Sequence, residues 1–455
     1  MFKARLAGLM LAVVCLVVPA LAGTAMAKEA ADIGALRQEA QLLEKLDEAS
    51  LALMDNDAQQ LMLQTFGNQF VPAALANLPD KLLRDQLAAL HREGYTFLAA
   101  EGTYYLAVDY PALLRAYERT AGPEVRDYLR LQAAETAQPA LRDGGLVISW
   151  HELGRRALAA EGFLRHYPES YRRSQVSDLF VAYASAFLFG VDNTPAWAGG
   201  ALRPEAADAW ARVAREHRDD WLAGYVRAAR SAAQKPAGER FADEKALRAR
   251  LLAEIYPEHR GVYSGERGQA TLLLPDGGLL LVEDRVGVAA QADWLLNGDD
   301  AGRPVLMTLR GAVNRALPEA GLASFYKQVL VADRVSEASH WLLDDPAMPF
   351  ALAGVGTEPF WHLRVLENGF VFFSALGEPV QLFASPVKET LADGFRYVLK
   401  RPDGAALEIT AQWVAGGVGD GMSDNLYPCR VTVVINGKTL KGSGFTQTEK
   451  VRKNI

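Results

Sequence analysis

The chain has 455 residues, of which 50% are hydrophobic, 23% are charged and 9% are aromatic. This is the composition of an ordinary globular protein, and it excludes a wholly disordered chain, a collagen and a polytopic membrane protein. The formal net charge of −7 argues against non-specific binding to nucleic acid, which needs a basic surface. The length suggests roughly two to four domains.

Residues 1–27 have the pattern of a secretory signal peptide. Lys3 and Arg5 form a positively charged start, an apolar stretch follows, and an A-x-A cleavage sequence ends at Ala27. The apolar stretch of about 16 residues is shorter than the roughly 20 that a membrane-spanning helix needs. We therefore expect cleavage and an exported, periplasmic protein that does not span the membrane and is free or envelope-associated. The alternatives are a retained membrane anchor and a lipoprotein modified on Cys15.

Residues 28–255 are predicted to form an all-helical domain, because apolar residues recur at helical spacing between breaks rich in Pro, Gly and Asp. The clearest helix start is a capping box. In it the Ser149 hydroxyl accepts from the amide of Glu152, and the Glu152 carboxylate returns to the amide of Ser149. Pro204 opens a further helix at a first-turn position. The many aromatic residues of this region either pack the helices together or line a groove for a peptide or glycan.

Two segments of this region, 163–171 and 213–221, look alike. Each ends one helix, turns and begins the next. The first segment, FLRHYPESY, resembles the turn of tetratricopeptide-like repeats in bacterial envelope proteins. The resemblance implies stacked helix pairs that bind other proteins. A plain irregular helical domain is the alternative.

The hydrophobic pattern then changes to a period of two residues, which marks a domain boundary. Residues 256–345 are predicted to form a small β domain, whose clearest hairpin joins strands 271–274 and 279–282 through a Pro-Asp-Gly-Gly turn. Residues 350–448 alternate most regularly and predict an antiparallel barrel or sandwich. The predicted fold class is therefore multidomain α + β. A helical, repeat-like or irregular N-terminal domain is followed by one or two small antiparallel β-barrel or sandwich domains.

Two motifs follow each other in the last domain, GTEPFW at 356–361 and DGMSD at 420–424. They resemble a family of small bacterial envelope β-barrel proteins of unassigned function, whose first motif reads GNEPFW. The paired cysteines of that family correspond to Val418 and Ser443 here, so the disulfide that the resemblance implies is lost. Residues 261–343 resemble the β domains of NlpE-type envelope lipoproteins, which are associated with copper and envelope stress. The paired cysteines of the copper-linked motif are absent from this segment.

The sequence contains no G-x-S-x-G motif, no glycine-rich phosphate loop and no dinucleotide-binding fingerprint. Its seven histidines are scattered, and Arg155 stands where a zinc-protease motif begun by His151 needs its second histidine. Cys429, the one cysteine beyond the leader, is in register with inward-facing strand positions, and we expect it in the core. We therefore expect no catalytic residue, no metal and no cofactor.

The candidate binding residues lie in and beside the two C-terminal motifs. The aromatic residues after Glu358 either plug one end of the barrel or form an exposed binding edge. The acidic loop at 420–424 either bonds its own backbone, as turn residues do, or recognises a partner. The candidates are Glu358, Phe360, Trp361, Asp420, Met422, Ser423, Asp424 and Tyr427.

These patterns favour a non-catalytic binding or scaffold protein of the cell envelope. Its helical domain would recognise another envelope protein or a cell-wall component. One alternative is a peptidoglycan-related enzyme, or an inhibitor of lysozyme or muramidase that acts through the loop at 420–424. Another is a protein of the copper or envelope-stress response.

Overall fold

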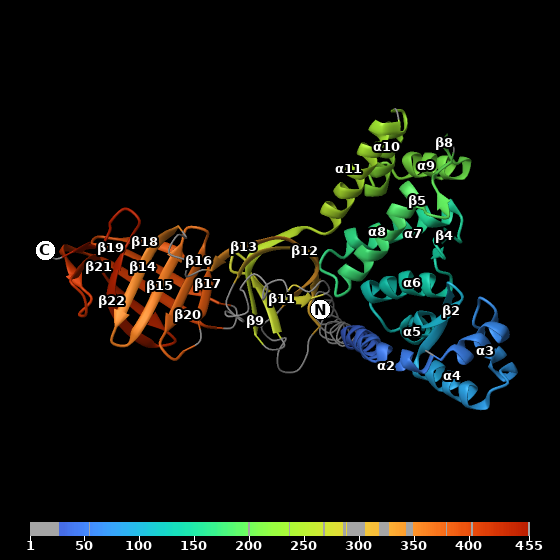
Figure 1. Ribbon diagram of the computed structural model, residues 1–455, viewed down its shortest axis with the longest axis horizontal. Coiled ribbons are helices and arrows are strands. Elements are labelled where there is room, and N and C mark those ends of the chain that lie inside the picture. The colour runs from blue at the N-terminus through green and yellow to red at the C-terminus, as the bar shows by residue number, and fades with distance from the viewer. Residues whose placement is uncertain are drawn as a thin grey trace, which may run out of the picture. The chain divides into compact units, whose positions relative to one another are not determined.

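The computed structural model describes residues 27–453 except 54, 199–200, 236, 267–268, 285–287, 289–304, 318–326, 343–348, 379 and 402–403. The chain divides into two compact units, Met1–Ile255 and Tyr256–Ile455 (Figure 1). The first is mainly helical and the second consists mainly of antiparallel strands, so the multidomain α + β fold class is confirmed. The expected leader, residues 1–27, lies outside the described residues apart from its last position. Within the described ranges, no helix has the length and apolar character needed to cross a membrane.

The first unit, called the helical unit below, opens with a helix at residues 27–44. The labelled helices that follow are α2 Leu46–Ser50, η1 Leu51–Leu53, α3 Asn56–Phe66, η2 Pro72–Asn77, α4 Lys81–Glu93, α5 Tyr110–Tyr117, α6 Pro123–Ala137, α7 Trp150–His166, α8 Arg173–Phe189, α9 Pro204–Glu216, α10 Trp221–Ala233 and α11 Ala237–Ile255.

The start of α7 shows half of the predicted capping box. The Ser149 hydroxyl accepts from the amide of Glu152 at 3.1 Å, as the sequence predicts. The carboxylate of Glu152 differs from the prediction, because it accepts from Arg155 and Arg156 one turn further along the helix. A charged guanidinium is a stronger donor than a backbone amide, so the carboxylate turns toward the arginines.

A β-hairpin interrupts the region that the sequence analysis took as helical throughout. Its strands are β1 Tyr95–Ala100 and β2 Thr103–Val108, and Glu101 and Gly102 form the turn with φ values of 50° and 72°. Alternate residues face the core, among them Tyr95, Phe97 and Leu106. This period of two in a run of aromatic and β-branched residues is a strand signal, and the helical interpretation overlooked it.

A hairpin followed by two helices recurs along the helical unit. The hairpin β1–β2 precedes α5 and α6, and short hairpins precede α7–α8 and α9–α10. The short strands are β3 Leu141–Arg142, β4 Gly145–Leu146, β5 Gly190–Val191, β6 Thr194–Pro195, β7 Trp197–Ala198 and β8 Ala201–Leu202. Successive turns are bonded in series, since Asp143 accepts from the amide of Glu101 at 2.5 Å and Gly144 accepts from the amide of Asn193 at 2.8 Å. A tetratricopeptide repeat is a helix pair without such a hairpin.

The second unit begins with a closed barrel of five strands. They are β9 Glu258–Glu266, β10 Gln269–Leu273, β11 Leu279–Asp284, β12 Val305–Arg315 and β13 Gln328–Leu342. They close in the order β10-β11-β13-β12-β9, and every pair is antiparallel except β11 with β13. This is the Greek-key arrangement of OB-type barrels. The predicted hairpin is present as β10 and β11, with its turn closed by a bond from the amide of Gly277 to Leu274.

The C-terminal sheet has ten strands in the order β17-β16-β15-β14-β22-β21-β20-β19-β18, with β23 paired to β21. The strands are β14 Phe350–Thr357, β15 Phe360–Leu366, β16 Phe370–Ala375, β17 Gln381–Ala384, β18 Val387–Leu391, β19 Gly394–Lys400, β20 Ala406–Gly419, β21 Asn425–Ile435, β22 Lys438–Phe445 and β23 Arg452–Lys453. Cys429 is fully buried in its core, as predicted, and burial raises the pKa of its thiol to about 11. The predicted turn at Asn436 and Gly437 joins β21 to β22.

The barrel and the C-terminal sheet share an apolar cluster. Val262 and Leu306 from the barrel pack with Leu366 and Phe370 from the C-terminal sheet. Ser385 also donates to the carbonyl of Pro275, at 2.8 Å. Both sheets therefore belong to one compact unit.

Candidate functional site

The two C-terminal motifs meet at one end of the C-terminal sheet. The hydroxyl of Thr357, in the first motif, donates to the carbonyl of Asp420, in the second, at 2.8 Å. The side chains of Phe360 and Met422 are 46% and 68% exposed at this end. Glu358 and Asp424 are exposed as well.

Trp361 of the first motif lies in the core of the sheet. Its side chain is fully buried and stacks on Phe373, with ring centroids 6.2 Å apart. A Cβ atom on Gly356 would lie 1.9 Å from the indole Nε1, and one on Gly442 would lie 2.6 Å from the same ring. The motif therefore joins a buried indole to glycines that leave room for it. The Trp361 side chain therefore fills the core of the sheet and does not contribute to an exposed edge.

Asp420 of the second motif closes its own turn. Its carboxylate accepts from the amides of Met422 and Ser423 at 2.9 and 2.8 Å. It also accepts from the hydroxyls of Ser423 and Tyr427 at 2.6 and 3.1 Å. These bonds, first among them that from the Ser423 hydroxyl, hold the pKa of Asp420 far below its usual range. Asp420, Ser423 and the buried Tyr427 thus satisfy one another. Five of the eight candidates are exposed, Ser423 among them.

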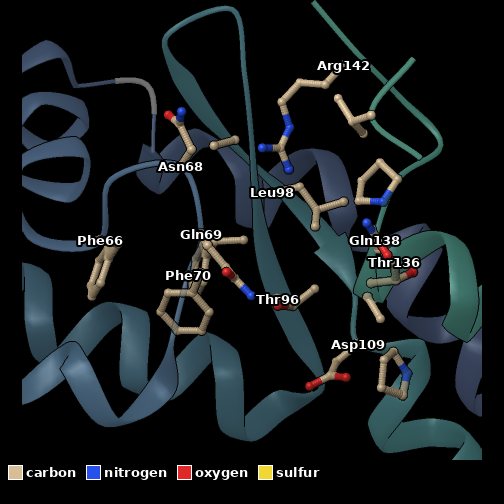
Figure 2. A pocket seen from close by; sticks show the side chains of 16 residues that line it. Phe66, Asn68, Gln69, Phe70, Thr96, Leu98, Asp109, Thr136, Gln138 and Arg142 are labelled. Carbon is tan, nitrogen blue, oxygen red and sulfur yellow. The ribbon is translucent and has the colours of Figure 1, made fainter. Parts of the chain in front are cut away.

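The helical unit contains a cavity of about 630 Å³ that the sequence analysis did not predict (Figure 2). Its walls are the loop after α3, strand β1, the end of α6 and strand β3. Phe66 and Phe70 lie on one side, with Thr136 and Gln138 on the other (Figure 2). The residues come from separate parts of the chain between 66 and 147, so no local motif marks the cavity.

One wall of the cavity is aromatic. The ring of Phe70 contacts those of Phe97 and Phe66 edge to face, with centroids 4.6 and 5.2 Å apart. Phe66 in turn contacts Tyr104 of β2. Each ring is held by another ring, so this wall is preformed.

Polar side chains line much of the rest. They are Asn68, Gln69, Thr96, Thr136 and Gln138, and none of these side chains has a hydrogen-bond partner within the described part of the chain. Amide and hydroxyl side chains both donate and accept. They are therefore available to a molecule that enters the cavity.

Arg142 lies at one end of the cavity, on β3, and Asp109 lies at the other (Figure 2). The Nε atom of Arg142 is buried and has no hydrogen-bond partner, and its guanidinium has no ion pair among the described residues. Asp109 caps α5, because its carboxylate accepts from the amide of Ala112 at 2.9 Å. The second carboxylate oxygen lies 3.9 Å from Nδ1 of His91. Arg142 is thus the cation of the cavity that is left without a counter-charge.

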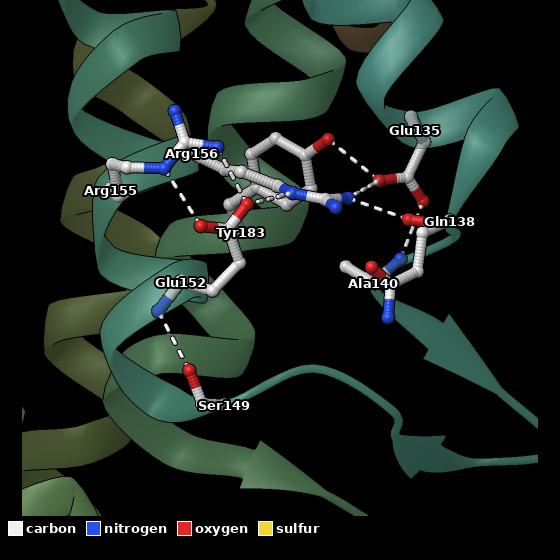
Figure 3. Close-up of polar contacts among 8 residues, drawn as sticks. All are labelled: Glu135, Gln138, Ala140, Ser149, Glu152, Arg155, Arg156 and Tyr183. Atoms are coloured by element: carbon white, nitrogen blue, oxygen red, sulfur yellow. Dashed lines mark hydrogen bonds and ion pairs between the residues drawn. The ribbon is translucent and has the colours of Figure 1, made fainter.

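A polar network fixes the α6 wall of the cavity against α7 (Figure 3). The buried Arg156 donates to the carbonyl of Gln138 at 2.8 Å and to the carboxylate of Glu135 at 3.0 Å. Tyr183 donates to the same carboxylate at 2.7 Å, and burial followed by the charge of Glu135 raises its pKa. This network holds the backbone of Gln138 in place while its side-chain amide faces the cavity.

The same network reaches the start of α7 through Glu152 (Figure 3). Arg155 donates to the Glu152 carboxylate at 2.7 and 2.6 Å, and Arg156 donates to it at 2.9 Å. These bonds, chiefly those from Arg155, hold the pKa of Glu152 at about 2. Both arginines are therefore neutralised, in contrast to Arg142.

The lining of the cavity contains few titratable side chains. Its titratable side chains are Arg142 and Asp109, and no cysteine, histidine or lysine is among them. Across the residues that the structure describes, no group of three His, Cys, Asp or Glu side chains is placed to hold a metal ion. Comparison of the chain with protein-family profiles, with curated proteins and with solved structures finds no match. The case for a function therefore rests on the geometry of the cavity.

Proposed function

We propose that this protein is a non-catalytic binding protein of the cell envelope, and that its helical unit recognises a partner at the cavity beside Arg142. The observation that carries the proposal is the set of polar side chains that line this cavity without partners among the described residues. Among these groups the Nε atom of Arg142 is buried, and a buried polar group without a hydrogen bond costs about 1–3 kcal/mol. A partner that accepts from this atom recovers that free energy, and the amides of Asn68, Gln69 and Gln138 are exposed and can bond to the same partner.

The size and composition of the cavity support the proposal. Ligand sites are commonly concave spaces of about 300–1,000 Å³, lined by apolar side chains with a few convergent polar groups. This cavity has a volume of about 630 Å³, a wall built on Phe66 and Phe70, and polar groups on the opposite side. Its aromatic wall is held by other rings, and its α6 wall is held by Arg156.

The leader and the C-terminal motifs support a place in the cell envelope. Residues 1–27 have the pattern of a signal peptide, and the motifs at 356–361 and 420–424 resemble those of an envelope family. The partner is then another envelope protein or a cell-wall component, of which a short segment or fragment enters the cavity.

The experiment compares the chain from residue 28 onward with its Leu98→Trp variant. Leu98 points into the cavity from β1 (Figure 2), so an indole there occupies the space of the ligand without disturbing the buried face of the hairpin. Leu82→Trp, at a position of α4 that is 70% exposed, is the matched control. Each protein is heated with and without a digest of purified cell wall and with and without a soluble envelope extract.

A ligand present at a hundred times its Kd stabilises a protein by about 2.7 kcal/mol, which raises the Tm of a unit of this size by several degrees. We expect this rise for the unsubstituted chain and for Leu82→Trp, and none for Leu98→Trp. An equal rise in all three proteins would place binding elsewhere and refute the proposal.

A further inference from the structure

We infer that the ligand of this cavity carries a free carboxylate and that Arg142 binds it. The inference rests on the binding function proposed above and names the chemistry of its ligand. Arginine keeps its charge at every physiological pH, and its planar fork of donors matches the two oxygens of a carboxylate. The cavity holds such a fork at one end without a counter-charge among the described residues.

Arg126 and Arg203 of the helical unit also have a buried Nε atom without a partner among the described residues, but of the three only Arg142 lines the cavity. Two other arginines show the pairing that Arg142 lacks. Arg156 pairs with Glu135 and Glu152, at 3.0 and 2.9 Å. Arg172 pairs with the fully buried Glu39 at 2.8 Å. In both places the fold supplies the carboxylate from within the chain. At Arg142 the Nε atom is buried without an acceptor, and the space in front of the guanidinium is the cavity (Figure 2). A ligand carboxylate completes the same pairing there.

The charge of the lining selects a carboxylate over a phosphate. Arg142 is the sole cation of the lining, and Asp109 at the far end is its sole anion. A phosphate monoester carries a charge near −2 at neutral pH, and this cavity offers it no second cation. A singly charged carboxylate is balanced by one guanidinium.

The rest of the lining describes the body of the ligand. The amides of Asn68, Gln69 and Gln138 each present donors beside an acceptor, which is the pattern that a peptide group also presents. Phe66, Phe70 and other apolar side chains accept an apolar part. A short peptide that ends in a free carboxylate has all three features. A sugar acid is the other source of the same carboxylate.

The test uses three probes on the chain from residue 28 onward. The first is a pool of N-acetylated tripeptides of randomised sequence with free carboxylates. The second is the same pool with C-terminal amides, and the third is N-acetylmuramic acid, a sugar acid. Binding is measured by equilibrium dialysis with mass spectrometry. The variants are Arg142→Gln, Arg142→Lys and Leu98→Trp, with Arg92→Gln on the exposed face of α4 as the control for loss of one charge.

We expect members of the acid pool to bind and the amide pool to bind at least about tenfold more weakly, because a hydrogen-bonded charge is lost. The affinity of Arg142→Gln for the acid pool should fall by about the same factor. The affinity of Arg142→Lys should lie between those of Arg142→Gln and the unsubstituted chain, and Arg92→Gln should bind the acid pool as the unsubstituted chain does. If N-acetylmuramic acid alone bound, and Arg142→Gln did not bind it, recognition of a carboxylate by Arg142 would be supported and the ligand would be a sugar acid.

Equal binding of the acid and amide pools would show that the cavity does not recognise a carboxylate. If Leu98→Trp abolished that binding, the cavity would still be a binding site. Failure of all three probes would also overturn this inference. The binding function itself fails if neither the wall digest nor the envelope extract raises the Tm of the unsubstituted chain, or if they raise the Tm of Leu98→Trp by the same amount.

Discussion

Single residues show that packing and turn formation account for two of the C-terminal candidates. Trp361 is fully buried against glycines, and the carboxylate of Asp420 accepts hydrogen bonds from four donors in its own turn. The residues that give these motifs their distinctive pattern are thus explained by packing and by turn formation. Arg142 and Trp361 each have a buried nitrogen without a hydrogen-bond partner in the described chain, but the guanidinium of Arg142 lines a cavity whereas the indole of Trp361 is packed in the core.

The packing role of Gly356 predicts a loss of stability in Gly356→Ala. The new Cβ would lie 1.9 Å from Nε1 of Trp361, so the indole or the strand must move. Overpacking of this kind costs about 1–3 kcal/mol, which urea denaturation followed by tryptophan fluorescence measures. Gly419→Ala is the control, because the nearest atom to its Cβ is 3.9 Å away, and it should be close to neutral. Equal stability of the two variants would contradict the packing role.

The low pKa of Glu152 predicts a contribution to stability that depends on pH. Its pKa falls from 4.5 to about 2 on folding, because Arg155 and Arg156 bind the charged form. Between those values the unfolded chain takes up the proton first, so stability rises with pH and the contribution is complete above about pH 5. We expect the deficit of Glu152→Gln in free energy of unfolding to be largest above pH 5 and to shrink toward pH 2. A deficit that is constant with pH would show that protonation of Glu152 is not coupled to folding.

At the scale of secondary-structure elements, the hairpins position the cavity. Strand β1 lines the cavity with residues 96–99, of which Thr96 and Leu98 lie on the half-buried face and Phe97 and Ala99 on the buried face, and β3 contributes Arg142. The free edge of β2 is covered by a side chain, since Gln59 donates to the carbonyl of Tyr104 at 2.9 Å and accepts from its amide at 2.6 Å. The amide of Gln59 thus replaces a neighbouring strand at this point.

Removal of that amide should loosen the hairpin. In Gln59→Leu both backbone groups of Tyr104 lose their partner, which costs about 1–3 kcal/mol. We expect the amide of Tyr104 to exchange with deuterium faster, in a measurement on the native protein. Gln60→Leu, at the next and exposed position of α3, should leave the exchange unchanged. Unchanged exchange in Gln59→Leu would mean that the strand edge is protected by something else.

The sequence predicts elements with regular patterns but does not predict the cavity. The Ser149 cap, the hairpin turn before Gly278 and the inward position of Cys429 all follow from local rules, and the structure contains them. The hairpin at 95–108 could have been predicted from its alternation. The cavity could not, because the placement of Phe70 and Arg142 around one space depends on how the loop after α3 packs beside β1 and β3. Nothing in either segment alone indicates the other.

At the scale of the whole molecule, the two units have different characters. The helical unit carries the cavity with its unpartnered polar lining, while the second unit is made of a barrel and a sheet joined by a shared apolar cluster. The C-terminal end that the sequence favours retains exposed Glu358, Phe360, Met422 and Asp424, while Asp420 and Ser423 bond to each other within the loop. We therefore propose that recognition belongs to the helical unit.

Hydrogen–deuterium exchange on the chain from residue 28 onward tests that assignment most directly. The protein is compared with and without the fraction of wall digest or envelope extract that raises its Tm. The account predicts protection confined to peptides that cover 66–70, 96–98 and 136–142, the segments that form the cavity. Protection at 356–361 and 420–427, with none at the cavity, would contradict it and return recognition to the C-terminal motifs.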